Sequence, residues 1–561
     1  MKNIQRTLIM LALFIFMIPW TNINAQNLVS VEYKRTYNLN QIQTIFDNLG
    51  VPPGLTFLPI RYQVRMYKIT YNTVAVDSVT PVIATGAFFV PVNPDCKISM
   101  INYNHGTLFS RSDAPSTLNG EEGKIGVLMA TDGYGMVMPD YLGLGDSPGL
   151  HPYHHSRSEA TAVIDMIRAC RQAADSLHLG LNGQLYITGY SQGGHVTMAT
   201  QRMIERYFSQ EMNVTATAPM SGAYDLSGVQ ASVVTSDVPY DAPAYLPYMV
   251  MSYRYAYHIY PDINTILKPP YNTTLPPLFD GTHGEGDVGN ATPNPPKQII
   301  DSLALLDYVN DSVNNPLRRA LRDNDVYDWV TTKPMRIIYC HGDYTVNPGN
   351  SIKAYNTFVR NGCGNLVSLV DMGNSSHYGC AMYALIIGKN FFDSLRKLNY
   401  VVGSISGCHT GISDGQASVT IKNGAPPFHV SWENGDTTAM SQRLHEGLNN
   451  VTVTDESRCP VSDSVYISTT TLGLNNSDLG ASIHLYPNPA SENATIDLSF
   501  IHTPVKAIEI ISPEGKVISS LSGSFSTRVM LETSSLTDGI YYIRILLADG
   551  RDAYKKVIIM R

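Results

Sequence analysis

Residues 185–194 read LYITGYSQGG and contain the pattern G-x-S-x-G over Gly189–Gly193. The apolar run Leu185–Gly189 is typical of a buried strand, and helical spacing follows over Gly194–Phe208. A serine on a sharp turn from strand to helix has its hydroxyl lifted clear of the sheet, and glycines on either side tolerate the crowding. This context predicts a nucleophilic Ser191 in preference to a plain glycine turn.

A second stretch, Gly411–Gly415 (GISDG), fits the same pattern. It precedes a strand in a segment rich in glycine and serine, so it lacks the strand-to-helix context that the chemistry requires. The pattern alone is therefore weak, and we assign no role to Ser413.

Around Ser191, residues 26–402 read as an α/β domain, because short apolar strands alternate with helical stretches. Residues 226–332 interrupt this rhythm with a segment rich in tyrosine and proline, which suits a cap over a substrate; ordinary core tyrosines in a surface excursion are the alternative. The expected strands are Val82–Val90, Ile98–Tyr103, Gly135–Pro139, Leu185–Gly189, Val214–Pro219, Met335–Cys340 and Leu366–Val370.

A serine nucleophile needs a base and a carboxylate, which follow it here in the order acid, then histidine. Asp343 comes just after the strand Met335–Cys340, and His377 lies in the loop after the next strand. Carboxyl ends of parallel strands share one edge of a sheet, so both side chains are expected beside Ser191. Asp225, after the preceding strand, is the rival for the acid.

The stretch Asn104–Thr107 (NHGT) follows the strand Ile98–Tyr103. A turn there can aim a backbone N–H at developing negative charge, and the second donor would be the N–H of Gln192. We therefore expect Thr107 and Gln192 to form an oxyanion hole, the alternative for the first being a plain glycine turn.

The stretch Gly133–Tyr153 (GYGMVMPDYLGLGDSPGLHPY), taken with YNHGT, GYSQGG and the late Asp343 and His377, resembles the secretory-lipase-like branch of the α/β hydrolases over residues 60–398. The resemblance implies an α/β-hydrolase fold with a mostly parallel, eight-stranded sheet. It also implies a Ser191–His377–Asp343 triad and ester or amide hydrolysis without a cofactor. One departure is that Asp343 follows Gly342 directly, whereas the family has a longer gap.

Composition and the N-terminus indicate export. The formal net charge is −8 and the sequence has no run of basic residues, which argues against a nucleic-acid partner. Lys2 and Arg6 precede the apolar run Leu8–Ile18, which is too short to span a membrane and predicts a signal peptide over residues 1–25; a membrane anchor is the alternative. No later segment is apolar for long enough to span a bilayer.

The chain has 7 cysteines, and none forms a C-x-x-C pair, so no metal site is expected from them. An oxidising compartment permits disulfides, and the odd number leaves at least one thiol unpaired within the chain. Cys408 and Cys459 are the only two in their segment, which favours their pairing.

Two small β-sandwiches are expected after the α/β domain. Residues 403–470 alternate short strands and are similar to Ig-like repeats of bacterial surface adhesins; a polar linker follows over 471–482. Residues 483–561 resemble the C-terminal sorting domain of type IX secretion, through LYPNPASENATIDLS at 485–499, GIYYIRI at 539–545 and the basic end. The resemblance implies passage through the periplasm and across the outer membrane by that machinery; a carbohydrate-binding sandwich is the alternative.

Two classes of function remain open from the sequence. The first is a secreted serine hydrolase that cleaves carboxylic esters, with a peptidase as the alternative, because one triad serves esters and amides alike. The second is a surface adhesin whose hydrolase-like domain binds without turnover.

Overall fold

The computed structural model describes residues 27–48, 59–117, 119–409, 411–470, 482–501, 503–513, 515–525 and 527–561. The predicted signal peptide and nearly all of the predicted linker lie outside these residues. The chain forms two compact units. The first holds the described residues up to Val401 together with 420–431 and 452–462, and the second holds the remainder.

A nine-stranded sheet in the order β1-β2-β3-β5-β4-β6-β7-β8-β9 forms the centre of the first unit. Along this order the strands from β5 to β9 pair parallel, whereas the pairs β1–β2, β2–β3 and β3–β5 are antiparallel. This is the expected mostly parallel sheet of an α/β hydrolase. The strands are β1 (Leu28–Tyr37), β2 (Val64–Val74), β3 (Pro81–Pro91), β4 (Ile98–Asn104), β5 (Tyr134–Pro139), β6 (Leu181–Tyr190), β7 (Val214–Met220), β8 (Met335–Tyr339) and β9 (Val367–Asp371).

The sheet has one strand more than the resemblance implied. The additional strand β1 pairs along β2, from Leu28 opposite Tyr71 to Tyr37 opposite Val64. It is an edge strand with several exposed side chains, so its sequence carries none of the continuous apolar character that marks the buried parallel strands.

Helices cover both faces of this sheet. Helices α2, α3 and α13 pack with Tyr103, Met136 and Ile338 on one face, whereas α4, α5 and α12 pack on the other. Alternate residues of each buried strand point to opposite faces, so both sides are apolar. The helices are α2 (Leu39–Asn48), α3 (Gly123–Thr131), α4 (Ser156–Ser176), α5 (Gln192–Met203), α12 (Gly349–Arg360) and α13 (His377–Arg396).

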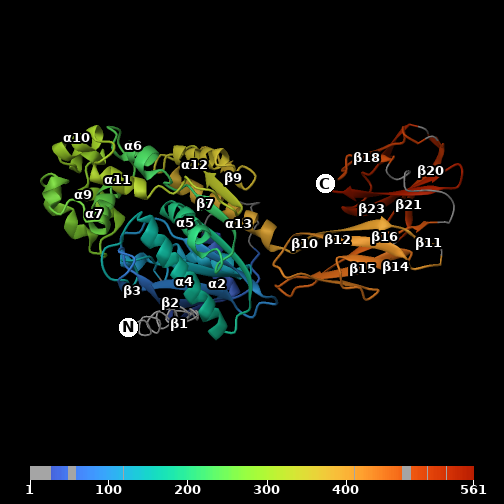
Figure 1. The fold of residues 1–561 in the computed structure, drawn as a ribbon, viewed down its shortest axis with the longest axis horizontal. Helices are drawn as coiled ribbons and strands as arrows, with labels where there is room; N and C mark the ends of the chain where they lie inside the picture. Colours follow the sequence, from blue (N-terminus) through green and yellow to red (C-terminus); the bar gives the residue numbers. More distant parts are fainter. Residues whose placement is uncertain are drawn as a thin grey trace, which may run out of the picture. The chain divides into compact units, whose positions relative to one another are not determined.

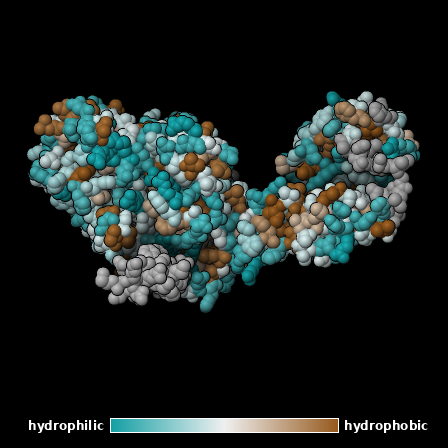
Figure 2. Space-filling model, in the orientation of Figure 1, coloured by the Kyte–Doolittle hydropathy of each residue, from teal (hydrophilic) through white to brown (hydrophobic). Residues whose placement is uncertain are grey.

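The tyrosine- and proline-rich segment between β7 and β8 folds into short helices that gather at one end of the first unit (Figure 1). It has apolar clusters of its own around Tyr248 and Tyr253. On the face drawn in Figure 2, hydrophobic residues are scattered among hydrophilic ones and recur at this end, where Leu303 and Leu306 are exposed. The helices are α6 (Ala231–Val234), α7 (Tyr245–Tyr257), α8 (Tyr271–Thr274), α9 (Glu285–Ala291), α10 (Ser302–Asn310) and α11 (Pro316–Asp323).

Short strands make up the rest of the chain. The first group forms the sheets β10-β12-β14, β11-β17 and β13-β15-β16. The second forms β18-β19-β22 and β21-β20-β23-β24, whose inner side chains share one apolar cluster, as in a small sandwich. The bounds are β10 (Asn399–Ser406), β11 (Cys408–His409), β12 (Gly415–Asn423), β13 (His429–Trp432), β14 (Met440–Leu444), β15 (Gly447–Thr454), β16 (Val461–Ile467), β17 (Thr469–Thr470), β18 (His484–Tyr486), β19 (Asn493–Asp497), β20 (Val505–Ile511), β21 (Val517–Phe525), β22 (Arg528–Glu532), β23 (Gly539–Leu547) and β24 (Asp552–Ile559).

The expected Cys408–Cys459 disulfide is wrong, because Cys459 is bonded to Cys96, 363 residues away in the sequence. The turn that carries Cys459 lies against the segment before β4, where the Lys97 N–H donates to the Ser457 carbonyl at 2.9 Å. Two cysteines in the same segment of the sequence need not pair, because contact between distant segments decides which cysteines meet. A second disulfide joins Cys340 to Cys380.

Among the described residues, we find no helix that combines the length and the apolar character needed to cross a membrane.

Candidate active site

Ser191 occupies the sharp turn between β6 and α5, as its sequence context predicts. Its φ of 60° and ψ of −121° are strained for a residue with a side chain. The flanking glycines are required, because a Cβ on Gly193 would lie 1.9 Å from the Asn104 carbonyl oxygen and one on Gly189 would lie 2.5 Å from the same atom. The turn therefore places the Ser191 hydroxyl at the carboxyl edge of the sheet.

Ser191, His377 and Asp343 meet at this edge. The Nε2 atom of His377 lies 2.9 Å from Ser191 Oγ, and its Nδ1 atom lies 2.6 Å from Asp343 Oδ2. All three side chains are buried. A proton on Nδ1 bonded to the carboxylate leaves Nε2 free to accept the serine proton.

Neighbouring groups fix the positions of Asp343 and His377. Asp343 Oδ1 accepts the N–H groups of Thr345 at 3.0 Å and Val346 at 2.8 Å. His377 begins α13, and its carbonyl accepts the Tyr190 hydroxyl. The rival carboxylate Asp225 is instead engaged by Lys353 Nζ and the Val229 N–H, each at 2.7 Å.

Of the two expected oxyanion donors, Gln192 directly follows the serine and Thr107 lies in the turn after β4. Gln192 is the first residue of α5, where a backbone N–H has no helical acceptor. Thr107 lies in the turn after β4, with its hydroxyl 3.1 Å from the Tyr153 hydroxyl. Within this turn the ring of His105 lies between the carbonyls of Gly106 and Asp140, and burial lowers the pKa of His105 to about 4. A neutral histidine therefore supports the turn.

Two buried carboxylates accept hydrogen bonds from the segments that carry these donors, and the sequence analysis identified neither. Glu122 Oε1 accepts the Gly106 N–H at 2.9 Å; burial raises the pKa of Glu122 to about 7, against the opposing effect of this hydrogen bond. Glu159 Oε1 accepts Gln192 Nε2 at 2.6 Å. Neither residue belongs to a motif with a recognisable spacing, although Glu159 closely follows the stretch Gly133–Tyr153.

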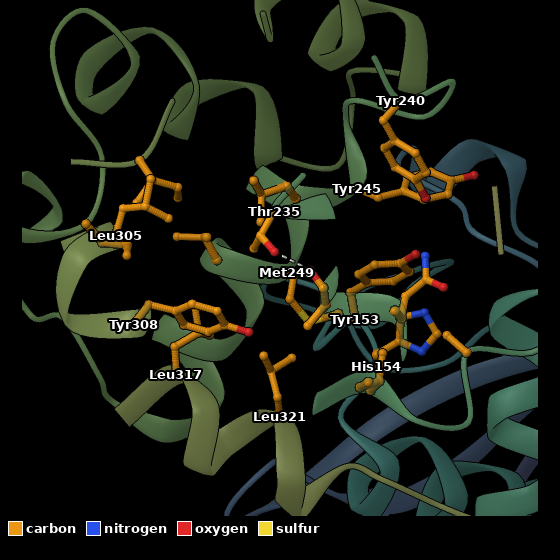
Figure 3. A pocket seen from close by; sticks show the side chains of 18 of the residues that line it. Tyr153, His154, Thr235, Tyr240, Tyr245, Met249, Leu305, Tyr308, Leu317 and Leu321 are labelled. Atoms are coloured by element: carbon orange, nitrogen blue, oxygen red, sulfur yellow. Dashed lines mark hydrogen bonds between the residues drawn. The ribbon is translucent and has the colours of Figure 1, made fainter. Parts of the chain in front are cut away.

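A largely apolar cavity opens beside Ser191 and Gln192 (Figure 3). The segment between β7 and β8 supplies most of its wall and so shapes the pocket. Burial raises the pKa of the tyrosine hydroxyls at the pocket wall, which keeps them neutral. Lining residues include Tyr153, His154, Tyr240, Tyr245, Met249, Leu305, Tyr308, Leu317 and Leu321.

This fold and this site define an α/β hydrolase, and comparisons with known proteins agree. Residues 118–383 match the secretory lipase family, and residues 484–560 match the secretion system C-terminal sorting domain. No curated protein matches the chain.

Two solved structures are similar to the first unit. A putative hydrolase from Legionella pneumophila is 29% identical, with 66% of this chain and 98% of that chain covered and a TM-score of 0.61. The rice cell wall degrading esterase LipA from Xanthomonas oryzae is 28% identical, with 66% and 96% covered and a TM-score of 0.57.

The chain thus joins a hydrolase domain that matches the secretory lipase family to a C-terminal domain that matches the sorting domain of type IX secretion. It is exported through the periplasm and across the outer membrane, to the cell surface or beyond. The similarity of residues 403–470 to adhesin repeats stays a prediction.

Proposed function

We propose that the protein is a secreted serine esterase that cleaves carboxylic esters through an acyl-enzyme. In this proposal Ser191 is the nucleophile, His377 the general base and Asp343 the residue that orients it. The observation that carries it is the unbroken line of contacts from Asp343 Oδ2 through the His377 ring to Ser191 Oγ, at 2.6 and 2.9 Å. Such a line activates a serine that is otherwise a weak nucleophile.

The reaction follows from these positions. Ser191 Oγ attacks the ester carbonyl carbon while its proton passes to His377 Nε2, and Asp343 stabilises the imidazolium that forms. The N–H groups of Thr107 and Gln192 bind the oxyanion of the tetrahedral intermediate. His377 then returns the proton to the departing alcohol oxygen, which leaves the acyl-enzyme. A water molecule attacks this ester with His377 again as the base, and the acid is released.

The cavity favours an ester with an apolar acyl group. Its wall is formed mostly by aliphatic and aromatic side chains, which gain free energy when they cover a hydrocarbon chain. A peptidase needs polar groups that bind an extended peptide backbone, and the lining offers few. The Xanthomonas relative is named as an esterase, which supports an ester over a peptide as the substrate.

We also propose a domain order for the exported chain. A signal peptide over residues 1–25 would be removed, and residues 26–402 would form the hydrolase domain with a cap over about 226–332. An Ig-like repeat over 403–470 and a linker over 471–482 would connect it to the sorting domain over 483–561, which the type IX machinery would recognise. Adhesion through the repeat would be an added role.

A substrate panel tests the proposal. The wild-type protein, Ser191→Ala and Ser413→Ala would be assayed on p-nitrophenyl esters of increasing chain length and on peptide p-nitroanilides. Ser413 is the matched control because it lies in the second G-x-S-x-G pattern and is exposed. We expect ester hydrolysis in the wild type and in Ser413→Ala, and a loss of about 10⁴-fold or more in Ser191→Ala. Hydrolysis of the anilides alone would favour the peptidase, and ligand binding without turnover would favour the adhesin.

A further inference from the structure

Three metal-binding side chains converge in the interior behind Gln192. His154 precedes α4, Glu159 lies in the first turn of α4, and His195 lies in α5. Their exposed fractions are 4%, 1% and 0%. His154 Nδ1, Glu159 Oε2 and His195 Nδ1 all lie within 4.8 Å of one another. Two imidazole nitrogens and one carboxylate oxygen are thus brought to one point by residues that no sequence motif connects.

None of these three atoms has a hydrogen-bond partner within the part of the chain that the structure describes. A buried polar atom without a partner destabilises the folded state, and such atoms are rare in folded proteins. Three of them at one point therefore indicate that a further group belongs between them.

The hydrogen-bonding character of the three atoms indicates what that group is. His195 Nε2 lies 2.9 Å from the Asn324 carbonyl oxygen, so it carries the proton and Nδ1 keeps its lone pair. This lone pair faces Glu159 Oε2 across 3.6 Å. Two acceptors that face each other in a buried site call for a donor or a cation between them, and a buried carboxylate calls for a positive charge beside it. A protonated His195 would supply one, but 3.6 Å is too long for a hydrogen bond and His154 Nδ1 would remain unpartnered.

We infer that His154, Glu159 and His195 bind a zinc ion behind the nucleophile turn. Zinc is bound by this set of two histidines and one glutamate in proteins, at about 2.0–2.2 Å from each ligand atom. Shifts of about 1 Å or less in the side chains bring the three atoms to that distance. The site takes no part in bond cleavage, and its occupation does not depend on the proposed esterase activity.

The surroundings match those of a metal site. The bond from His195 Nε2–H to a backbone carbonyl is the outer contact that orients a metal-binding histidine. Glu159 Oε1 accepts the backbone N–H of His154 at 3.0 Å and the Gln192 side-chain amide N–H at 2.6 Å, which fixes the carboxylate. His154 also lines the cavity, so an ion can reach the site from the pocket (Figure 3). An ion held by Glu159 and His195 would join α4 to α5 and stiffen the turn that carries Ser191.

Metal analysis tests the inference directly. The mature chain, prepared without a histidine tag, would be stripped with a chelator, titrated with Zn²⁺ or Co²⁺ and desalted. We expect one equivalent of Zn²⁺ to be retained, a melting temperature that rises with zinc, and visible d–d absorption of bound Co²⁺ that Zn²⁺ abolishes. A wild type that retains no metal would overturn the inference and leave a protonated His195 to balance Glu159.

Variants locate the ion. His154→Phe removes one ligand and keeps a ring of similar size, and we expect it to lose both the retained zinc and the zinc-dependent rise in melting temperature. His409→Phe, which alters a histidine paired with Asp414, is the control and should behave as the wild type. Unchanged zinc content in a folded His154→Phe, or a near-ultraviolet thiolate band with Co²⁺, would place the metal elsewhere and overturn the inference. If His154→Phe fails to fold, His154→Asn offers the same comparison, and the wild-type cobalt spectrum decides without any variant.

Discussion

At the scale of single residues, Glu122 links pH to the turn after β4. Its carboxyl is buried and accepts the Gly106 N–H, and burial raises its pKa to about 7 from the ordinary 4.5. The folded protein therefore holds this proton more tightly than the unfolded chain does. The stability that this group contributes is full below pH 4.5 and is lost as the pH rises from about 4.5 to about 7.

Glu122→Gln tests this linkage. The glutamine side chain can still accept the Gly106 N–H through its amide oxygen, but it cannot ionise. The variant therefore does not lose stability as the pH rises. Relative to the wild type, it should gain roughly 3 kcal/mol between pH 4.5 and pH 8, at about 1.4 kcal/mol per pKa unit. Urea unfolding at several pH values measures the gain. The neighbouring Glu121→Gln is the control, because Glu121 is exposed and pairs only with Lys124. A variant whose stability difference from the wild type is the same at all pH values would contradict the account.

At the scale of secondary-structure elements, the Cys340–Cys380 disulfide ties the end of β8 to the first turn of α13. Cys340 lies just before Asp343 in the chain, and Cys380 lies just after His377. The bond therefore joins the two segments that carry the proposed acid and base, whose contact must be held within a few tenths of an ångström for efficient catalysis.

Replacing both cysteines by serine should lower kcat by about 10-fold or more with little change in KM, since a misplaced base affects chemistry more than binding. The matched control is Cys96→Ser with Cys459→Ser, which removes a disulfide remote from the triad. This control should lower the melting temperature, because a native disulfide contributes about 2–4 kcal/mol, while kcat stays within about twofold. Equal kcat values for the two double variants would show that the first disulfide has only a structural role.

At the scale of the whole molecule, the sorting domain and the hydrolase domain have separate apolar cores. Deleting residues 483–561 should therefore leave kcat/KM on a soluble ester within about twofold. The same deletion should prevent passage across the outer membrane, so that the protein accumulates in the periplasm. Fractionation of the native host with an antibody to the hydrolase domain measures this. Surface display of the truncated chain would show that export uses another signal.

The sequence analysis predicted the features that local sequence patterns determine. Ser191 is marked by its turn, and Asp343 and His377 follow strands whose carboxyl ends share an edge, so chain order and topology suffice to bring them together. The disulfide partner of Cys459 and the groups around Glu159 could not be predicted from the sequence, because they depend on how distant segments pack. The strands β1 and β2 were missed for another reason, since the exposed edge strand β1 and the partly exposed strand β2 lack the continuous apolar run of the buried parallel strands.

The central claim is that Ser191 is an activated nucleophile, and covalent labelling tests it most directly. The folded wild-type protein would be treated with a tagged fluorophosphonate, and the modified peptide would be located by tandem mass spectrometry. The account predicts a single adduct on Ser191, none in Ser191→Ala, and slow labelling in His377→Ala, where the base is absent. An adduct on another serine, or no adduct on a protein that hydrolyses esters, would contradict it.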